Sequence, residues 1–155
     1  ASYTPRYEDT GYFLLKYLPR QGGNSQCTGD KDLNYRNNLR VYRYAETLLN
    51  AAELILRTGG DTAEAQNYLD QVRARAYRTT VENLGAHKVV ANIDNVLEER
   101  HLELYGEGKR FWDLVRSGKA NEVLGSRGYK DNKKYLPIPS SEIDKSAGTL
   151  TQNPY

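Results

Sequence analysis

The pattern of apolar and polar positions predicts an antiparallel helical hairpin over residues 39–78. From residue 39 onward, apolar side chains recur every three or four positions and polar ones fill the opposite face, as in an amphipathic helix exposed on one side. The apolar stripe consists of Val41, Tyr44, Ala45, Leu48, Ala51, Ala52 and Ile55, and the polar face of Arg43, Glu46, Asn50, Glu53 and Arg57. Gly59-Gly60 predicts the end of this helix, because glycine accepts the left-handed cap conformation.

A second helix is predicted directly after this turn. Asp61 is a ready N-cap, and Glu64 stands three residues further on, as in a capping box. The second apolar stripe consists of Ala65, Tyr68, Leu69, Val72 and Ala76. Small side chains at Ala52 and Ala65 would let the two helices approach closely. The hairpin therefore resembles one tetratricopeptide unit, which must stack on neighbouring elements to bury its face.

The rest of the chain predicts more helices between irregular segments, within one domain of 155 residues. In the range 92–124, Asn92 can cap a third helix that ends near residue 105, and shorter helices are expected at 109–116 and 120–124. Residues 1–38 are predicted to be an irregular lead-in, with one possible strand at 10–17. Residues 125–155 are expected to form an extended C-terminal tail with a short turn at 142–144. The predicted fold class is mainly α, a tetratricopeptide-like hairpin with additional helices and long irregular loops.

Charge and cysteine content exclude several classes of protein. The chain has 22 basic and 20 acidic residues, a net charge of +2, which favours neither nucleic acid nor an anionic membrane as a partner. Its single cysteine, Cys27, cannot form an internal disulfide, and no apolar run reaches the length of a membrane span. Because the chain contains no methionine, we expect a processed protein or a fragment of a longer one.

Candidate chemistry is sparse. Glu98 and His101 have the spacing of the Glu-x-x-His element in di-iron bundles, but that site needs a second such element and further carboxylates. We therefore expect no metal, no cofactor and no catalytic residue, with ion pairs among the charged residues instead. Trp112 is predicted to be a buried core anchor on a short helix, with Arg110 and Asp113 as structural residues beside it.

Three segments carry a resemblance to a known family. They are residues 38–53 (NLRVYRYAETLLNAAE), residues 97–118 (LEERHLELYGEGKRFWDLVRSG), and residues 136–144 (LPIPSSEID) followed by 151–154 (TQNP). The second is the most specific, since it holds the family's glutamate-glycine-x-arginine-phenylalanine-tryptophan-aspartate-leucine run in order. The chain thus resembles the C-terminal region of the SusD/RagB family, whose members are several times longer.

The resemblance implies a function for the longer protein. It implies a non-catalytic surface lipoprotein of the Bacteroidetes outer membrane that captures oligosaccharides for a SusC-like TonB-dependent transporter. The family's lipidated cysteine has no counterpart here, because no apolar signal segment precedes Cys27, so the lipid anchor is expected outside this chain. No sugar-site motif of the family matches position by position, and no binding residue is carried over.

Two rival functions remain open on the residues alone: a helical-repeat module that binds proteins, and an α-helical enzyme that cleaves glycans. Tyrosine is the most over-represented aromatic residue, with 13 Tyr against 2 Phe and 1 Trp, and most tyrosines are expected in half-buried packing. Tyr3, Tyr7 and Tyr12 are the candidates for sugar contact, because they alternate with charged residues in the lead-in.

Overall fold

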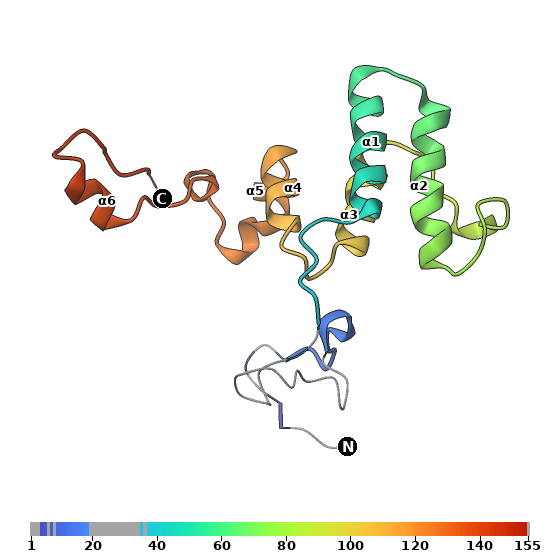
Figure 1. Cartoon of the computed structure of the whole chain (residues 1–155), viewed down its shortest axis with the longest axis horizontal. Helices are drawn as coiled ribbons and strands as arrows, with labels where there is room; N and C mark the ends of the chain where they lie inside the picture. Colours follow the sequence, from blue (N-terminus) through green and yellow to red (C-terminus); the bar gives the residue numbers. More distant parts are fainter. Residues whose placement is uncertain (1–3, 6, 8, 19–34, 36, 155) are drawn as a thin grey trace.

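The computed structural model describes residues 4–5, 7, 9–18, 35 and 37–154. Within this part the chain is helical, with irregular connections and no strand (Figure 1). The α-helices are α1 (Tyr44–Thr58), α2 (Thr62–Ala76), α3 (Ile93–Glu103), α4 (Arg110–Arg116), α5 (Ala120–Leu124) and α6 (Ser140–Lys145). Short 3-10 helices are η1 (Leu15–Tyr17), η2 (Gly85–His87), η3 (Gly125–Arg127) and η4 (Asp131–Lys134). The predicted mainly α fold is therefore confirmed.

The α1–α2 hairpin forms for the reasons its sequence predicts. Gly59 adopts a left-handed conformation with φ +70°, and the N–H of Gly60 donates to the carbonyl of Ile55 at 2.9 Å. Asp61 then caps α2 by accepting a hydrogen bond from the N–H of Ala63 at 2.8 Å. These contacts satisfy terminal backbone groups of both helices across a very short turn, so the helices run side by side (Figure 1).

The main core lies where α3 crosses the hairpin. Leu49, Ala52, Ala65, Leu69 and Val96 are fully buried, and they come from α1, α2 and α3. The side chain of Asn92 accepts a hydrogen bond from the N–H of Asn95 and starts α3 at the predicted place. Because Ala52 and Ala65 carry only a methyl group, α1 and α2 pack closely at this point.

Smaller units follow toward the C-terminus. A second apolar cluster contains Leu114, Ala120 and Tyr129, which joins α4 and α5 to the turn after them. Beyond it, α6 lies away from the α1–α3 bundle (Figure 1). The side-chain amide of Gln152 links the end of this tail to the residues before α6. Its Oε1 accepts a hydrogen bond from the N–H of Ile138 at 2.8 Å, and its Nε2 donates to the carbonyl of Ile138 at 2.9 Å.

The strand considered for residues 10–17 is not formed. The end of that segment is the 3-10 helix η1, and its contact with the bundle is a side chain rather than a strand pair: Lys16 Nζ donates to the carbonyls of Glu103 and Tyr105, at 2.8 and 3.0 Å. A strand needs a neighbour that takes up its backbone hydrogen bonds, and the described residues offer none here. None of the described helices is both long and apolar enough to cross a membrane.

Candidate functional site

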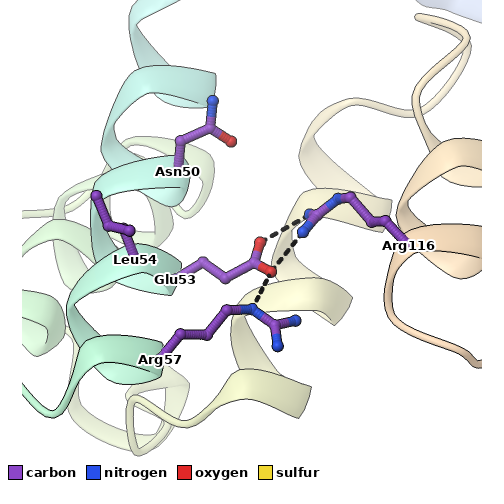
Figure 2. Close-up of a pocket in the computed structure, with 5 residues that line it drawn as sticks. All are labelled: Asn50, Glu53, Leu54, Arg57 and Arg116. Atoms are coloured by element: carbon purple, nitrogen blue, oxygen red, sulfur yellow. Dashed lines mark hydrogen bonds and ion pairs between the residues drawn. The ribbon is translucent and has the colours of Figure 1, made fainter.

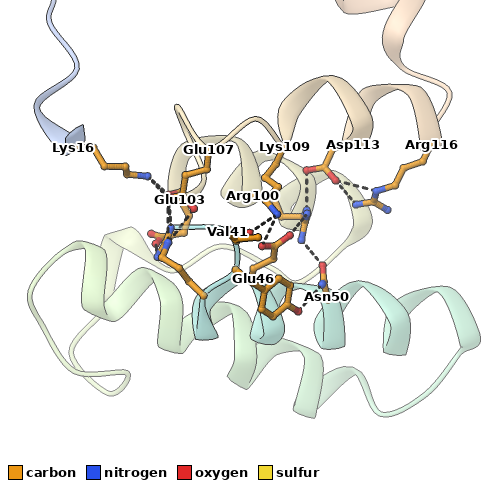
Figure 3. A network of polar contacts seen from close by, with 12 residues as sticks. Lys16, Val41, Glu46, Asn50, Arg100, Glu103, Glu107, Lys109, Asp113 and Arg116 are labelled. Carbon is orange, nitrogen blue, oxygen red and sulfur yellow. Dashed lines mark hydrogen bonds and ion pairs between the residues drawn. The ribbon is translucent and has the colours of Figure 1, made fainter. Parts of the chain in front are cut away.

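Charged side chains fill the junction of α1, α3 and α4, where an apolar core would be expected (Figure 3). We call this set the ionic junction; it consists of Lys16, Arg43, Glu46, Asn50, Glu53, Arg100, Glu103, Glu107, Lys109, Asp113 and Arg116. Many of its members lie in the segments 38–53 and 97–118 that carry the family resemblance. The junction is therefore the structural counterpart of those motifs.

Arg100 is at the centre of the ionic junction, with only 5% of its side chain exposed. Its Nε donates to Asp113 Oδ2 at 2.9 Å, its Nη1 donates to Asn50 Oδ1, and its Nη2 lies 3.7 Å from Glu46 Oε1. Glu46 also pairs with Lys109, whose Nζ lies 3.2 Å from Glu46 Oε2. One guanidinium thus links α1, α3 and α4, and a buried charge is tolerated only when it is paired in this way.

A second guanidinium, that of Arg43, joins α1 to the turn after α3. It lies 2.6 Å from Glu103 Oε1 and 2.8 Å from Glu107 Oε1, and Lys16 Nζ reaches the same Glu107 oxygen at 2.7 Å. Burial alone would raise the pKa of Glu107, but hydrogen bonds from Arg43 and Lys16 outweigh it and hold this pKa below its ordinary value. The hydrogen bonds that Arg43 donates to Glu107 outweigh the opposing effect of burial and raise the pKa of Arg43.

Gly106 shapes the turn that presents Glu107. It has φ +76°, and a Cβ at this position would come within 2.8 Å of Leu14 Cδ2. A side chain here would be strained by the backbone conformation and would also force the Leu14 side chain to move. The Gly-Glu-Gly sequence therefore places one carboxylate, that of Glu107, beside the two cations Lys16 and Arg43.

Glu53 is a buried member of the ionic junction, where α1 faces Arg116 of α4 (Figure 2). It accepts hydrogen bonds from Arg116 at 2.5 and 2.7 Å and from Arg57 at 2.8 Å. Burial would raise the pKa of Glu53, yet these donors lower it below its ordinary value. Hydrogen bonding to Glu53, partly opposed by burial, raises the pKa of Arg116. The carboxylate therefore stays ionised and acts as a fixed link between α1 and α4.

Glu99 behaves differently from these carboxylates. It pairs with Arg73 of α2 at 2.5 Å, but burial dominates and raises its pKa above the ordinary value. Glu98 and His101 lie 3.5 Å apart, and the described residues contain no group of three or more His, Cys, Asp or Glu side chains that could hold a metal ion. The charged residues of α3 are engaged in ion pairs.

The described surface has several small pockets. Three of them, of about 230, 240 and 200 Å³, lie beside Glu53, beside Gly106 and beside Glu99. Each of the carboxylates that line them is held by at least one arginine. Such pockets can contact a ligand or a protein segment, but they do not present a free acid–base pair for catalysis.

Of the three tyrosines chosen from the sequence as candidates for sugar contact, the structure describes Tyr7 and Tyr12. Tyr7 is 93% exposed and Tyr12 is 90% exposed, while Tyr3 and residues 19–34 lie outside the described part. Among the described tyrosines, the expectation of half-buried packing is wrong for those with more than half of their surface exposed, which are Tyr7, Tyr12, Tyr42, Tyr44 and Tyr105. The exposed ones are Tyr7, Tyr12, Tyr35, Tyr42, Tyr44, Tyr77, Tyr105 and Tyr135.

The prediction that Trp112 is a buried anchor is also wrong, since 48% of it is exposed. On the short helix α4, Asp113 faces Arg100 and Leu114 faces the second apolar cluster, which leaves Trp112 on the outer side with an edge contact to Phe111 (ring centroids 5.1 Å apart). Arg110 is half-buried and lies 3.8 Å from Glu98. Asp113 is buried within the ionic junction.

Comparison with known proteins identifies the family. The model of the SusD family matches residues 2–155. The chain belongs to the SusD family. Among curated SusD-family relatives, SusD-like protein P2 of Formosa agariphila is 32% identical over 153 residues, which cover 91% of this chain and 30% of the relative. SusD-like protein P38 of the same organism is 42% identical over 95 residues, 57% of this chain and 18% of the relative.

Solved structures of SusD-like proteins agree with the fold over essentially the whole chain. Surface glycan-binding protein A from Bacteroides thetaiotaomicron is 49% identical with a TM-score of 0.84, and the match covers 100% of this chain and 33% of that protein. The same protein in complex with laminarihexaose gives a TM-score of 0.83. A laminarin-binding SusD-like protein is 44% identical with a TM-score of 0.81, covering 99% of this chain and 31% of its own. The chain thus spans about a third of its relatives' length.

Proposed function

We propose that this chain is part of a protein that captures oligosaccharides without cleaving them. The observation that carries the proposal is the match of the entire chain, at 49% and 44% identity, to proteins named for binding glycan or laminarin. Since one of those structures holds laminarihexaose, a laminarin-type oligosaccharide is the first ligand to test. Glycan capture, rather than protein binding alone, is thus the function best supported for the polypeptide as a whole.

The share of this chain in that function is mainly structural support. Its motif residues form ion pairs with one another in the ionic junction, so they hold helices together. Glu46 Oε2, which has no hydrogen-bond partner among the described residues, is buried beside Lys109 and out of reach of a sugar. For the same reason we propose that the chain has no catalytic role, because glycoside hydrolysis needs two carboxyl groups that flank a cleft. The sugar-contacting aromatic residues of this chain would be Tyr7 and Tyr12 in the exposed lead-in.

The proposed setting is the cell surface. We propose that the whole protein is an outer-membrane lipoprotein, anchored by a lipid outside these residues, and that it passes oligosaccharide to a SusC-like TonB-dependent transporter. A balanced net charge of +2 is consistent with uncharged sugars as the ligand rather than nucleic acid. The family membership of the chain supports this setting.

Titration calorimetry with product analysis tests the proposal. This chain and the longest natural polypeptide that contains it are titrated with laminarihexaose and with starch, mucin and plant oligosaccharides, and each sugar is then examined by chromatography. We expect the longer polypeptide to bind a sugar and return it intact, and the 155-residue chain to bind weakly or not at all. Binding of no glycan would refute glycan capture, and a shortened sugar would refute the non-catalytic role. Micromolar binding by the chain alone that vanishes in Tyr7→Ala would show that its share is larger than support.

A further inference from the structure

Lys16 is the member of the ionic junction that the N-terminal lead-in supplies (Figure 3). Its Nζ donates to the carbonyls of Glu103 and Tyr105 at 2.8 and 3.0 Å, and to Glu107 Oε1 at 2.7 Å. These acceptors engage all three donors of the ammonium group. The two carbonyls lie at the C-terminal end of α3, where backbone carbonyls lack partners within the helix. A lysine 87 residues earlier in the chain than Glu103 therefore caps α3.

Further contacts fix the residues on either side of Lys16. Leu14 lies against Gly106, where an added Cβ would come within 2.8 Å of Leu14 Cδ2. The side-chain amide of Asn37 donates to the carbonyl of Tyr17 at 3.1 Å, and the guanidinium carbon of Arg40 lies 5.4 Å from the centre of the Tyr17 ring. Residues 14–17 are thus held at several points, and we call them the anchored segment.

Two exposed aromatic side chains directly precede the anchored segment. Tyr12 is 90% exposed and Phe13 is 69% exposed. On their N-terminal side the chain turns at Gly11, which has φ +75° and whose N–H donates to Asp9 Oδ1 at 2.8 Å. The two aromatic residues therefore lie between a local turn and the anchored segment, so their backbone is held on both sides while most of their surface faces solvent.

We propose that Lys16 is a positioning residue for sugar binding, because it holds Tyr12 and Phe13 where the apolar face of a pyranose ring of an uncharged oligosaccharide can stack on them. This inference rests on the proposed function of glycan capture. An aromatic side chain offers a flat apolar face, and tyrosine adds a hydroxyl that can bond a sugar. A ligand that must first order a loose segment loses binding free energy to that ordering, whereas an aromatic surface fixed in advance avoids this loss. Lys16 therefore strengthens binding without touching the sugar.

Amide hydrogen exchange and titration calorimetry test this role in the longest natural polypeptide that contains the chain. Lys16→Met removes the ammonium group but leaves Glu107 its contact with Arg43. Lys88→Met is the matched control, because Lys88 also pairs with a buried carboxylate, that of Asp70 at 3.0 Å, which likewise keeps another donor. We expect Lys16→Met to speed amide exchange in residues 11–17 and to weaken laminarihexaose binding roughly three- to tenfold, and Lys88→Met to do neither. Unchanged affinity despite faster exchange, or an equal loss of affinity in both variants, would overturn the proposal and leave glycan capture standing.

A double-mutant cycle separates positioning from general stability. If Lys16 acts through the aromatic surface, adding Lys16→Met to Tyr12→Ala/Phe13→Ala should cause no further loss of affinity, whereas independent, additive losses would refute the role. Asn37→Ala covers the case in which Lys16→Met prevents folding, since it frees only the exposed carbonyl of Tyr17. We expect it to weaken binding about twofold, and an unchanged affinity would contradict the proposal. Binding of no glycan by the unsubstituted polypeptide would instead refute glycan capture, and this inference with it.

Discussion

Arg100→Met tests whether the ionic junction holds the fold together. The substitution keeps most of the side-chain volume but removes a guanidinium whose partners Asp113 and Glu46 have only 4% and 7% of their side chains exposed. Removing one partner of a buried ion pair typically costs roughly 3–5 kcal/mol, because the other charge stays buried without its partner. Here Asp113 keeps Arg116 at 2.6 Å and Glu46 keeps Lys109, so we expect the low end, about 3 kcal/mol.

Thermal unfolding followed by circular dichroism measures this effect. For a chain of this size about 3 kcal/mol corresponds to a fall in melting temperature of roughly 6–12 °C. Lys145→Met is the control, because its pair with Glu142 is exposed and should contribute almost nothing. The double variant Arg100→Met/Asp113→Leu should lose less than the sum of the two single variants, since neither charge is then left alone. If Arg100→Met lowered the melting temperature no more than Lys145→Met, the junction would not be a stabilising element.

Three further predictions concern packing, exposure and pH. Ala52→Leu or Ala65→Leu should lower the free energy of unfolding in urea by roughly 1–3 kcal/mol, because both positions are fully buried where α1 and α2 cross. Unchanged urea midpoints would contradict this packing. Trp112 fluorescence should be quenched readily by iodide, and Trp112→Ala should cost clearly less than the roughly 3–5 kcal/mol of a buried tryptophan; inaccessible fluorescence would show that the side chain is covered. Acid should destabilise the fold, because the pKa values of Glu53 and Glu107 are lowered in the folded protein. Their contribution to the free energy of unfolding is complete above the ordinary glutamate pKa of about 4.3, and it is lost as the pH falls through the lowered values. Urea midpoints measured from pH 7 to pH 3 should show this loss, and Glu53→Gln should reduce it.

Local signals were sufficient to predict the hairpin. The stripe spacing, Gly59 and the Asp61 cap act within a few residues of each other, so the sequence shows where α1 ends and where α2 begins. The predicted start of α1 is too early: the helix begins at Tyr44, after Arg43, which makes no side-chain cap, and Val41 lies outside it and is exposed. Asn92 is a similar case, since its side chain caps α3 from its own N-terminus. Local capping contacts of this kind transfer directly from sequence to structure.

Long-range burial was not predictable in the same way. Glu46 and Glu53 are polar residues on the face of α1 opposite the apolar stripe, and such a face is normally solvated. They are buried because α3 and α4 cover them with Arg100 and Arg116. A pattern on one helix cannot show that its charged side will meet complementary charges 54 and 63 residues further on. The exposure of Trp112 was unpredictable for the same reason. A large apolar residue is expected inside, but on α4 the inward positions are occupied by Asp113, which accepts a hydrogen bond from Arg100, and by Leu114.

The location of the family motifs in the ionic junction bears on where sugar specificity is encoded. The Arg-Tyr-Ala-Glu segment supplies Arg43 and Glu46, and the later motif supplies Glu107 and Asp113, all of which are engaged with partners inside the protein. Residues used in this way can be shared by proteins that bind different glycans, because they fix the helices and not the ligand. Differences in ligand would then arise on exposed loops that a rigid junction supports. If the whole protein captures glycans as proposed, substitutions in these motifs should reduce binding of every glycan together, through loss of folded protein, rather than change which glycan is preferred.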